Sequence, residues 1–183
     1  MDIEKDLHII DRVAKEKEEE NWEFRSFLKQ LDIDIEKLDA IVHQITTEVT
    51  SQIDCTECGN CCKHVRPELD TEDITRFATG LKMSIAKLQA KYLTQDEDTG
   101  SNQVFNSLPC PFLENSMCTN YECRPKACAS YPHLDKDEFV FRLWSVVENY
   151  GICPIVFHVY NQLRKELWHY NEFDEDDFVD LDD

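Results

Sequence analysis

Apolar residues recur at three- and four-residue steps through the first part of the chain, and charged residues fill the positions between them. The pattern begins at Ile3 and Leu7 and predicts a helix over residues 1–31. Asp34 suits the N-cap of a second helix. The apolar stripe of this second helix consists of Leu38, Ile41, Val42, Ile45 and Val49. Because short loops join antiparallel neighbours, residues 1–53 are expected to form a helical hairpin.

Further helices are predicted in the middle and at the end of the chain. Thr71 suits the N-cap and Gly80 the C-terminal stop of one helix, and Ser84 suits the start of the next. Pro154 fits the first turn of a last helix. Residues 139–147 fit a strand as well as a helix, because they combine aromatic and β-branched side chains.

The segment between these helices has an irregular composition. Four prolines and four cysteines fall within residues 109–132. Proline interrupts helix interiors and central strands, so we expect short strands and turns here. The sequence therefore predicts a mainly α fold, with an N-terminal helical hairpin and further helices packed around an irregular, Cys-rich centre with short strands.

Three segments are expected along the chain. A helical hairpin occupies residues 1–53, and a cysteine-cluster domain occupies residues 54–170. Residues 171–183 form an acidic tail whose composition predicts disorder.

The chain is strongly acidic, with a net charge of -19 and a pI near 4.6. Such a surface repels phosphate backbones, so we expect no nucleic-acid partner. The charge is typical of a soluble surface, and docking onto a basic protein partner is the alternative. Only four glycines occur, and they are too far apart to form a phosphate-binding loop. The composition therefore argues against nucleotide-dependent enzymes.

No stretch approaches the roughly 18 apolar residues of a membrane span, and residues 1–17 lack the apolar core of a signal peptide. We therefore expect a cytoplasmic protein with no membrane partner. In a reducing compartment its nine cysteines favour metal binding over disulfides, and an odd number fits disulfide pairing poorly.

The first cysteine cluster is Cys55, Cys58, Cys61 and Cys62. Two-residue gaps let successive thiolates converge on one metal, and Gly59 permits a tight turn between two of them. Adjacent cysteines seldom serve the same ion. Cys61 and Cys62 therefore indicate two neighbouring metals, or one ligand and one thiol with another role.

A second group of cysteines completes the predicted set of eight metal ligands. It consists of Cys110, Cys118, Cys123 and Cys128. Zinc favours four thiolates in a closed tetrahedral site, and two such sites would use all eight. A [4Fe-4S] iron–sulfur cluster favours three cysteines at two-residue gaps and a remote fourth before proline. Cys110-Pro111 and Cys153-Pro154 both match that fourth position, so both metals remain open, with zinc preferred.

Three residues are candidate additional ligands: Cys153, His64 and His133. Each histidine follows a cysteine within a few residues, so either imidazole could complete a ligand shell. Cys153 stands apart from both groups, and a cysteine in an apolar setting is equally often a small buried hydrophobic residue.

The combined pattern resembles the CxxCxxCC (YkgJ-type) cysteine-cluster family of zinc- or iron-chelating domains. The likeness rests on the first cluster, Thr71-Glu72-Asp73-Ile74, Cys110-Pro111-Phe112-Leu113, Cys118, Tyr121-x2-Arg124-Pro125-x2-Cys128 and Tyr131-Pro132. Ala129 departs from the family, which usually has arginine after that cysteine, and Cys123 and Cys153 fall outside its pattern. The resemblance implies a metal-chelating domain. The flagellin lysine N-methylases carry this domain within a longer chain, so their activity is not carried over.

Three side chains of this motif are expected to lie around the metal. Arg124 suits hydrogen bonding to thiolates and offsets their charge, although pairing with a surface carboxylate is an equal alternative. Two tyrosines are expected to shield the site from water: Tyr121 and Tyr131.

The function predicted from these features is an accessory or interaction role for a metal-binding protein whose cysteine site organises a small, loop-rich core. One alternative is an iron–sulfur enzyme that performs protein methyl transfer or redox chemistry. Another alternative is metal delivery or storage, for which labile thiolates are needed.

Overall fold

The computed structural model describes residues 3–96, 100 and 102–168. The acidic tail predicted at residues 171–183 lies outside the described residues. Within the described ranges, no helix is both long enough and apolar enough to cross a membrane.

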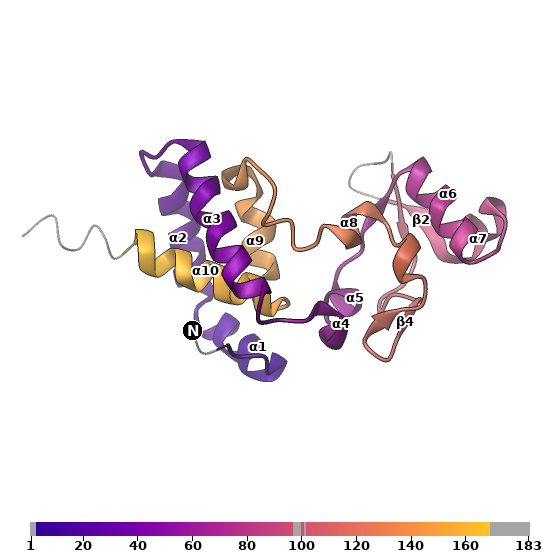
Figure 1. Cartoon of the computed structure of the whole chain (residues 1–183), viewed down its shortest axis with the longest axis horizontal. Coiled ribbons are helices and arrows are strands. Elements are labelled where there is room, and N and C mark those ends of the chain that lie inside the picture. Colours follow the sequence, from indigo (N-terminus) through magenta and orange to yellow (C-terminus); the bar gives the residue numbers. More distant parts are fainter. Residues whose placement is uncertain (1–2, 97–99, 101, 169–183) are drawn as a thin grey trace, which may run out of the picture. The chain divides into compact units, whose positions relative to one another are not determined.

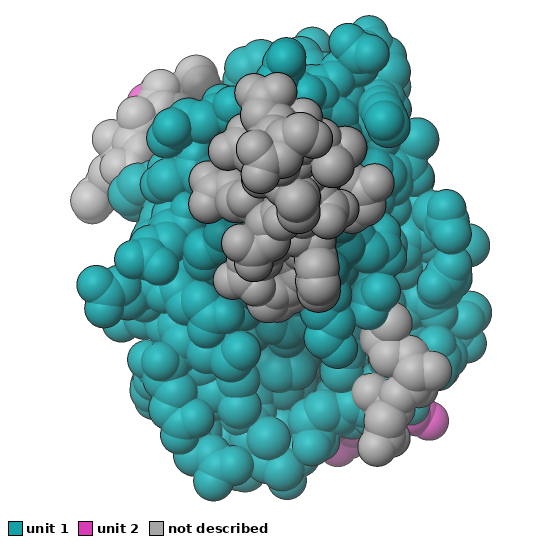
Figure 2. All heavy atoms as spheres, turned by 90° about the vertical axis from the view of Figure 1, so that its left-hand side faces the viewer, with its two compact units in different colours: residues 1–53, 132–183 teal, residues 54–131 magenta. Residues whose placement is uncertain are grey.

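The chain divides into two compact units (Figure 2). The first, which we call the helical unit, combines residues 1–53 with residues 132–183. The second, the cysteine unit, is residues 54–131. The cysteine unit is therefore inserted between two segments that pack together.

The helical unit contains elements from both ends of the chain. They are α1 (Leu7–Glu16), α2 (Glu18–Gln30), α3 (Ile35–Thr50), the 3-10 helix η2 (Phe139–Arg142), α9 (Leu143–Asn149) and α10 (Pro154–Leu167). α10 packs on α3, and α9 packs on α2 (Figure 1). The predicted helix over residues 1–31 is two helices, because the backbone of Lys17 leaves helical geometry between α1 and α2.

The core of the helical unit follows from the periodic stripes in the sequence. Leu38 and Val42 of α3 are buried, as are Val156 and Leu163 of α10. Pro154 occupies the first turn of α10, as predicted. Tyr160 is buried as well, and its hydroxyl donates a 2.9 Å hydrogen bond to the backbone oxygen of Asn21.

The observed division differs from the predicted one in a single respect. The boundary between residues 53 and 54 coincides with the prediction, but residues 132–168 belong with the first helices and not with the cysteines. Residues 139–147 are helical, in η2 and the start of α9. Periodicity predicts that a helix has an apolar face, but it does not identify the element that covers that face.

A buried carboxylate fixes the connection between the two segments of the helical unit. Asp39 on α3 accepts hydrogen bonds from the backbone N–H groups of Glu138, at 2.6 Å, and Phe139, at 2.9 Å. These groups begin η2, where they have no partner within the helix itself. Asp39 therefore acts as an N-terminal cap supplied from a distant part of the sequence.

Replacing Asp39 by alanine is expected to lower the free energy of unfolding of the helical unit by about 2 kcal/mol, because two backbone donors lose their acceptor. Chemical denaturation followed by tryptophan fluorescence measures this change, since all three tryptophans lie in this unit. Glu36 is exposed on the same helix, so Glu36→Ala is the matched control and should change the free energy by no more than about 0.5 kcal/mol. Equal effects of the two substitutions would contradict the capping role.

The cysteine unit is built from short elements. They are α4 (Cys55–Cys58), α5 (Cys61–His64), β1 (Glu68–Leu69), α6 (Thr71–Gly80), α7 (Ile85–Tyr92), β2 (Leu93–Gln95), β3 (Gln103–Phe105), β4 (Leu113–Glu114), β5 (Met117–Cys118), the 3-10 helix η1 (Tyr121–Cys123) and α8 (Lys126–Ala129). The first three strands form an antiparallel sheet in the order β1-β3-β2, and β4 pairs with β5. The expected mainly α fold with short strands is confirmed.

The cysteine unit has a small aromatic core beneath α6 and α7. Phe77 of α6 meets Phe112 edge-on, with ring centroids 4.8 Å apart, and both rings contact Phe105 of β3. Cys110 and Cys118 pack against this core and are only partly buried. The core therefore supports the segment that carries the cysteines of the second group.

Local caps in the cysteine unit agree in part with the sequence prediction. Ser84 caps α7 through its hydroxyl, as expected. The cap of α6 is Asp70, whose side chain accepts from the N–H of Asp73, and Thr71 is the first residue of the helix. Aspartate and threonine are both favoured N-cap residues, so the sequence alone does not decide which of Asp70 and Thr71 caps the helix.

Candidate metal centre

The nine cysteines are all thiols in the described structure, and none forms a disulfide. The eight predicted ligands lie in the cysteine unit, where Cys55 is exposed and the others are partly exposed. Cys153 lies in the helical unit at the start of α10 and is 7% exposed. Partial exposure distinguishes the eight from cysteines that only fill a core, whereas the burial of Cys153 favours a packing role.

Four of these thiols lie within electrostatic reach of one another. Burial raises the pKa of Cys128 to about 12, and the charges of three other thiols add to this effect. The three are Cys62, Cys110 and Cys118. Burial also raises the pKa of Cys110 to about 11, with further contributions from Cys62 and Cys118. We call these four residues the thiol group.

The thiol group is assembled from four separate places in the chain. Cys62 lies on α5, and its backbone oxygen accepts a 2.7 Å hydrogen bond from the N–H of Cys110. Cys118 lies on β5 opposite Leu113, so the β4–β5 hairpin fixes its distance from Cys110. Cys128 lies on α8. Backbone hydrogen bonds thus bring together cysteines that are far apart in sequence.

The first cluster is divided between two short helices. Cys55 and Cys58 lie on α4, and burial, followed by the charge of Cys58, raises the pKa of Cys55. Cys61 and Cys62 lie on α5, where a hydrogen bond from the Cys61 thiol lowers the pKa of Cys62 to about 7. Gly59 separates the two helices in the left-handed region, with φ 58°, as its predicted role in a tight turn requires.

Arg124 lies beside the thiol group. Its guanidinium stacks on the ring of Tyr121, 3.7 Å from the centroid, and donates a 2.8 Å hydrogen bond to the backbone oxygen of Tyr121. Its positive charge opposes the burial that raises the pKa values of Cys118 and Cys128. A cation held in this position favours the thiolate forms that bind metals.

A family model described as "CxxCxxCC: Putative zinc- or iron-chelating domain" matches residues 54–145, which is half of the chain. The chain belongs to the CxxCxxCC family. The resemblance inferred from the cysteine pattern is therefore confirmed. No curated protein and no solved structure matched the chain.

A buried carboxylate of the CxxCxxCC domain holds α8 in place, and its role was missed in the sequence. Asp73 is 3% exposed, pairs with Arg76 on the same helix and accepts a 3.0 Å hydrogen bond from the N–H of Lys126. Arg76 in turn donates to the backbone oxygen of Arg124 at 3.0 Å. Asp73 and Arg76 therefore hydrogen-bond to the backbone of Lys126 and Arg124, the residues on either side of Pro125. This segment leads into α8, the helix that carries Cys128. The acidic residue of the family pattern was visible in sequence, but its partner was not.

Cys123 faces another part of the CxxCxxCC domain. Its Sγ lies close to Gly80 at the end of α6, where an added Cβ would approach it to 2.8 Å. Asn120 also lies against Gly80 and donates a 2.9 Å hydrogen bond to the backbone oxygen of Phe77. Cys123 is not among the thiols whose charges act on Cys128. The close approach of this segment to α6 requires the glycine.

The remaining predicted residues are less closely tied to the thiol group. His64 is exposed at the end of α5. His133 belongs to the helical unit, and Tyr131 is half-buried at the last position of the cysteine unit. Their predicted roles as ligands or as a shield stay predictions.

The cysteines of the CxxCxxCC domain are donors of the type that zinc and iron take, the two metals in the family description. Among the described residues, no three His, Cys, Asp or Glu side chains are already arranged to hold a metal ion. The thiol group nevertheless offers four sulfur donors, the type that zinc and iron–sulfur clusters take, with a cation beside them. The donors fit by chemistry and by number, and binding requires their side chains to draw together.

Proposed function

We propose that this CxxCxxCC protein is a zinc protein with an accessory, interaction role, and that Cys62, Cys110, Cys118 and Cys128 bind one zinc ion. The observation that carries the proposal is that backbone contacts bring these cysteines together from separate places in the chain: the N–H of Cys110 bonds to the backbone oxygen of Cys62, and Cys118 lies opposite Leu113 in the β4–β5 hairpin. The charges of Cys62, Cys110 and Cys118 all act on Cys128, in agreement with this grouping. A tetrahedral zinc site takes four thiolates. Zinc bound by these four residues would cross-link α5, the segment before β4, the β4–β5 hairpin and α8.

Zinc accounts for this set better than an iron–sulfur cluster does. A cluster of the ferredoxin type would join Cys55, Cys58 and Cys61 with one remote cysteine. The charges that act on Cys55 come from Cys58 and Asp54, both within its own turn of chain. The charge of Cys62 instead contributes to the raised pKa values of Cys110 and Cys118 in the second group. The four thiols therefore comprise one cysteine of the first cluster and three of the second group. A structural zinc site that cross-links distant segments requires ligands from such separate parts of the chain.

Metal delivery is a second candidate, and one observation favours it. Cys55 is exposed, and Cys58 and Cys61 are partly exposed, close in sequence to Cys62. Accessible thiols beside a bound ion provide incoming and outgoing ligands for its exchange. A structural site would release zinc to a chelator slowly, whereas a delivery site would release it rapidly.

Protein purified without oxygen is expected to contain one zinc ion per chain and no iron, and to be colourless. Elemental analysis and the visible absorption spectrum measure these properties. Zinc has filled d orbitals and no visible transitions, whereas iron–sulfur clusters absorb strongly. Stoichiometric iron together with a brown colour would overturn the assignment of zinc and favour the iron–sulfur alternative.

A further inference from the structure

The helical unit has an open apolar groove that the metal centre does not use. Its volume is about 330 Å³, and it lies where α2 ends, α3 begins and η2 passes. Leu31, Ile33 and Ile35 line one side, and Val140 and Phe141 line another. Apolar side chains gathered around a concave surface are typical of a binding site for bulky apolar groups.

The groove is bordered by large apolar side chains that contribute little to the core. Phe141 is 71% exposed, although Phe139 on the same short helix is buried at 1%. Ile35 is 39% exposed at the start of α3. Trp144 on α9 is also exposed, but it does not line the groove, and its ring lies 4.7 Å from that of Trp22. An exposed aromatic side chain in a groove, here Phe141, is typical of protein-binding surfaces.

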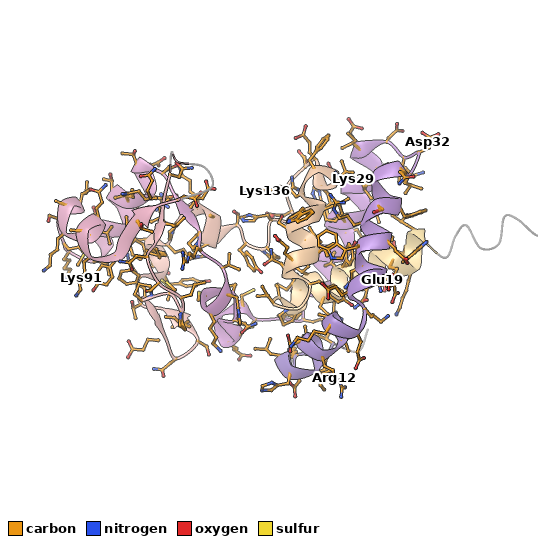
Figure 3. The ribbon with its side chains drawn as sticks, turned by 180° about the vertical axis from the view of Figure 1, so that it is seen from behind. Arg12, Glu19, Lys29, Asp32, Lys91 and Lys136 are labelled. Atoms are coloured by element: carbon orange, nitrogen blue, oxygen red, sulfur yellow. The ribbon has the colours of Figure 1, made fainter. Side chains whose placement is uncertain are left out.

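Charge indicates the kind of molecule that this groove binds. The helical unit has 27 acidic and 11 basic side chains, and eight of the acidic ones belong to residues 169–183, so residues 1–53 and 132–168 alone carry a charge of -8. Exposed Asp32 and Asp34 alternate along the chain with the lining residues Leu31, Ile33 and Ile35, and Lys29 is itself a lining residue; Figure 3 labels Lys29 and Asp32. Lysines thus contribute to the border, but the field of the whole unit is negative and attracts cationic partners.

Two other occupants are disfavoured by the same charge. A second copy of this chain would bring a second helical unit with a charge of -16 against the first. The segment 169–183 contains eight acidic residues and no lysine or arginine, so it is repelled as well. The negative field that repels a second copy and the segment 169–183 attracts a positively charged partner.

We propose that this groove binds a segment of another protein in which bulky apolar side chains are flanked by lysine or arginine. The apolar side chains enter between the α2–α3 loop and η2, against Phe141. The basic side chains lie over the acidic surface around Asp32 and Asp34. This inference concerns the helical unit and is independent of the metal that the cysteine unit binds.

Three short labelled peptides added to the full chain test the proposal by fluorescence anisotropy. The first contains leucine and lysine, with the leucines on one helix face. The second replaces lysine by glutamate, and the third replaces leucine by serine. Only the leucine–lysine peptide is expected to bind tightly, because it alone supplies both the apolar side chains and the positive charge.

Phe141→Ala is expected to weaken binding of the leucine–lysine peptide about tenfold or more. The matched control is Met117→Ala, which removes another exposed apolar side chain, 48% exposed, from the cysteine unit and should leave the affinity unchanged. Because Phe141 is mostly exposed, its replacement should preserve the fold. Asp32→Asn combined with Asp34→Asn should also weaken binding of the leucine–lysine peptide. Added salt should reduce the difference in affinity between this double variant and the unchanged protein.

Each of the other outcomes would overturn the proposal. Equal binding of the serine–lysine peptide would show that charge alone attracts these peptides. Unchanged affinity in Phe141→Ala would exclude the groove as the site. Dimerisation in sedimentation that Phe141→Ala abolishes would identify a second copy as the occupant. Tighter peptide binding after removal of residues 169–183, dependent on Phe141, would identify that segment as the occupant.

Discussion

Replacing Cys128 by serine is expected to abolish zinc binding and to unfold the cysteine unit, while the helical unit stays folded. The cysteine unit has strands of only two or three residues and a small aromatic core. Structural zinc contributes about 10–16 kcal/mol in small metal-dependent domains, which exceeds the stability of most domains of this size. Loss of one of four thiolates therefore removes more free energy than the remaining contacts supply.

The distribution of aromatic residues allows the two units to be followed separately. All three tryptophans lie in the helical unit, so their fluorescence should be unchanged in Cys128→Ser. Hydrogen exchange of the α6 and α7 amides, measured by mass spectrometry, should become fast. Cys123→Ser is the matched control, because its sulfur lies beside Gly80 and Cys123 is not among the thiols whose charges act on Cys128. Retained zinc and retained protection in Cys128→Ser would contradict the proposed ligand set.

Replacing Asp73 by alanine is expected to have the second largest effect, a loss of about 3 kcal/mol in the stability of the zinc-bound cysteine unit. The substitution leaves Arg76 without its partner and the N–H of Lys126 without its acceptor. The segment from Arg124 to Cys128 then loses its fixed position. Zinc affinity should therefore fall as well, although Asp73 itself is not a ligand.

Competition with a coloured chelator measures the zinc affinity of Asp73→Ala, and hydrogen exchange measures the stability of the unit. Glu72→Gln is the matched control on the same helix, because Glu72 is exposed and pairs only with the exposed Lys126 side chain. Surface pairs of this kind contribute at most about 1 kcal/mol. If Asp73→Ala and Glu72→Gln gave equal zinc affinities, the positioning role of Asp73 would be excluded.

Most helices could be predicted from the sequence because their signals are local. The apolar stripe of α3, the Ser84 cap of α7 and Pro154 at the start of α10 each depend on neighbouring residues. The break at Lys17 was not predicted, since charged residues on both sides continue a good helical pattern. The strands β1 and β3 are too short to show alternation, and they are defined by pairing across a long connection that contains α6, α7 and β2.

The cysteines were visible in the sequence as candidate ligands, but their arrangement in space was not. Spacing grouped Cys62 with Cys55, Cys58 and Cys61, because spacing describes only residues close along the chain. The electrostatic neighbours of Cys62 in the second group depend on the backbone hydrogen bond to Cys110 and on the position of α8. The function of Asp73 depends in the same way on an N–H group 53 residues away.

The insertion of the cysteine unit between α3 and η2 sets an order of events during synthesis. The apolar faces of α2 and α3 are completed only by α9 and α10, which the ribosome makes after all of residues 54–131. At about 5–20 residues per second, that delay is roughly 4–16 s. All eight thiols of the cysteine unit are therefore exposed to cellular zinc before the helical unit can close. If these thiols bind zinc as proposed, the ion can be acquired before the fold is complete, and a chain starved of zinc would present an unfolded insert at the moment when its two helical segments must meet.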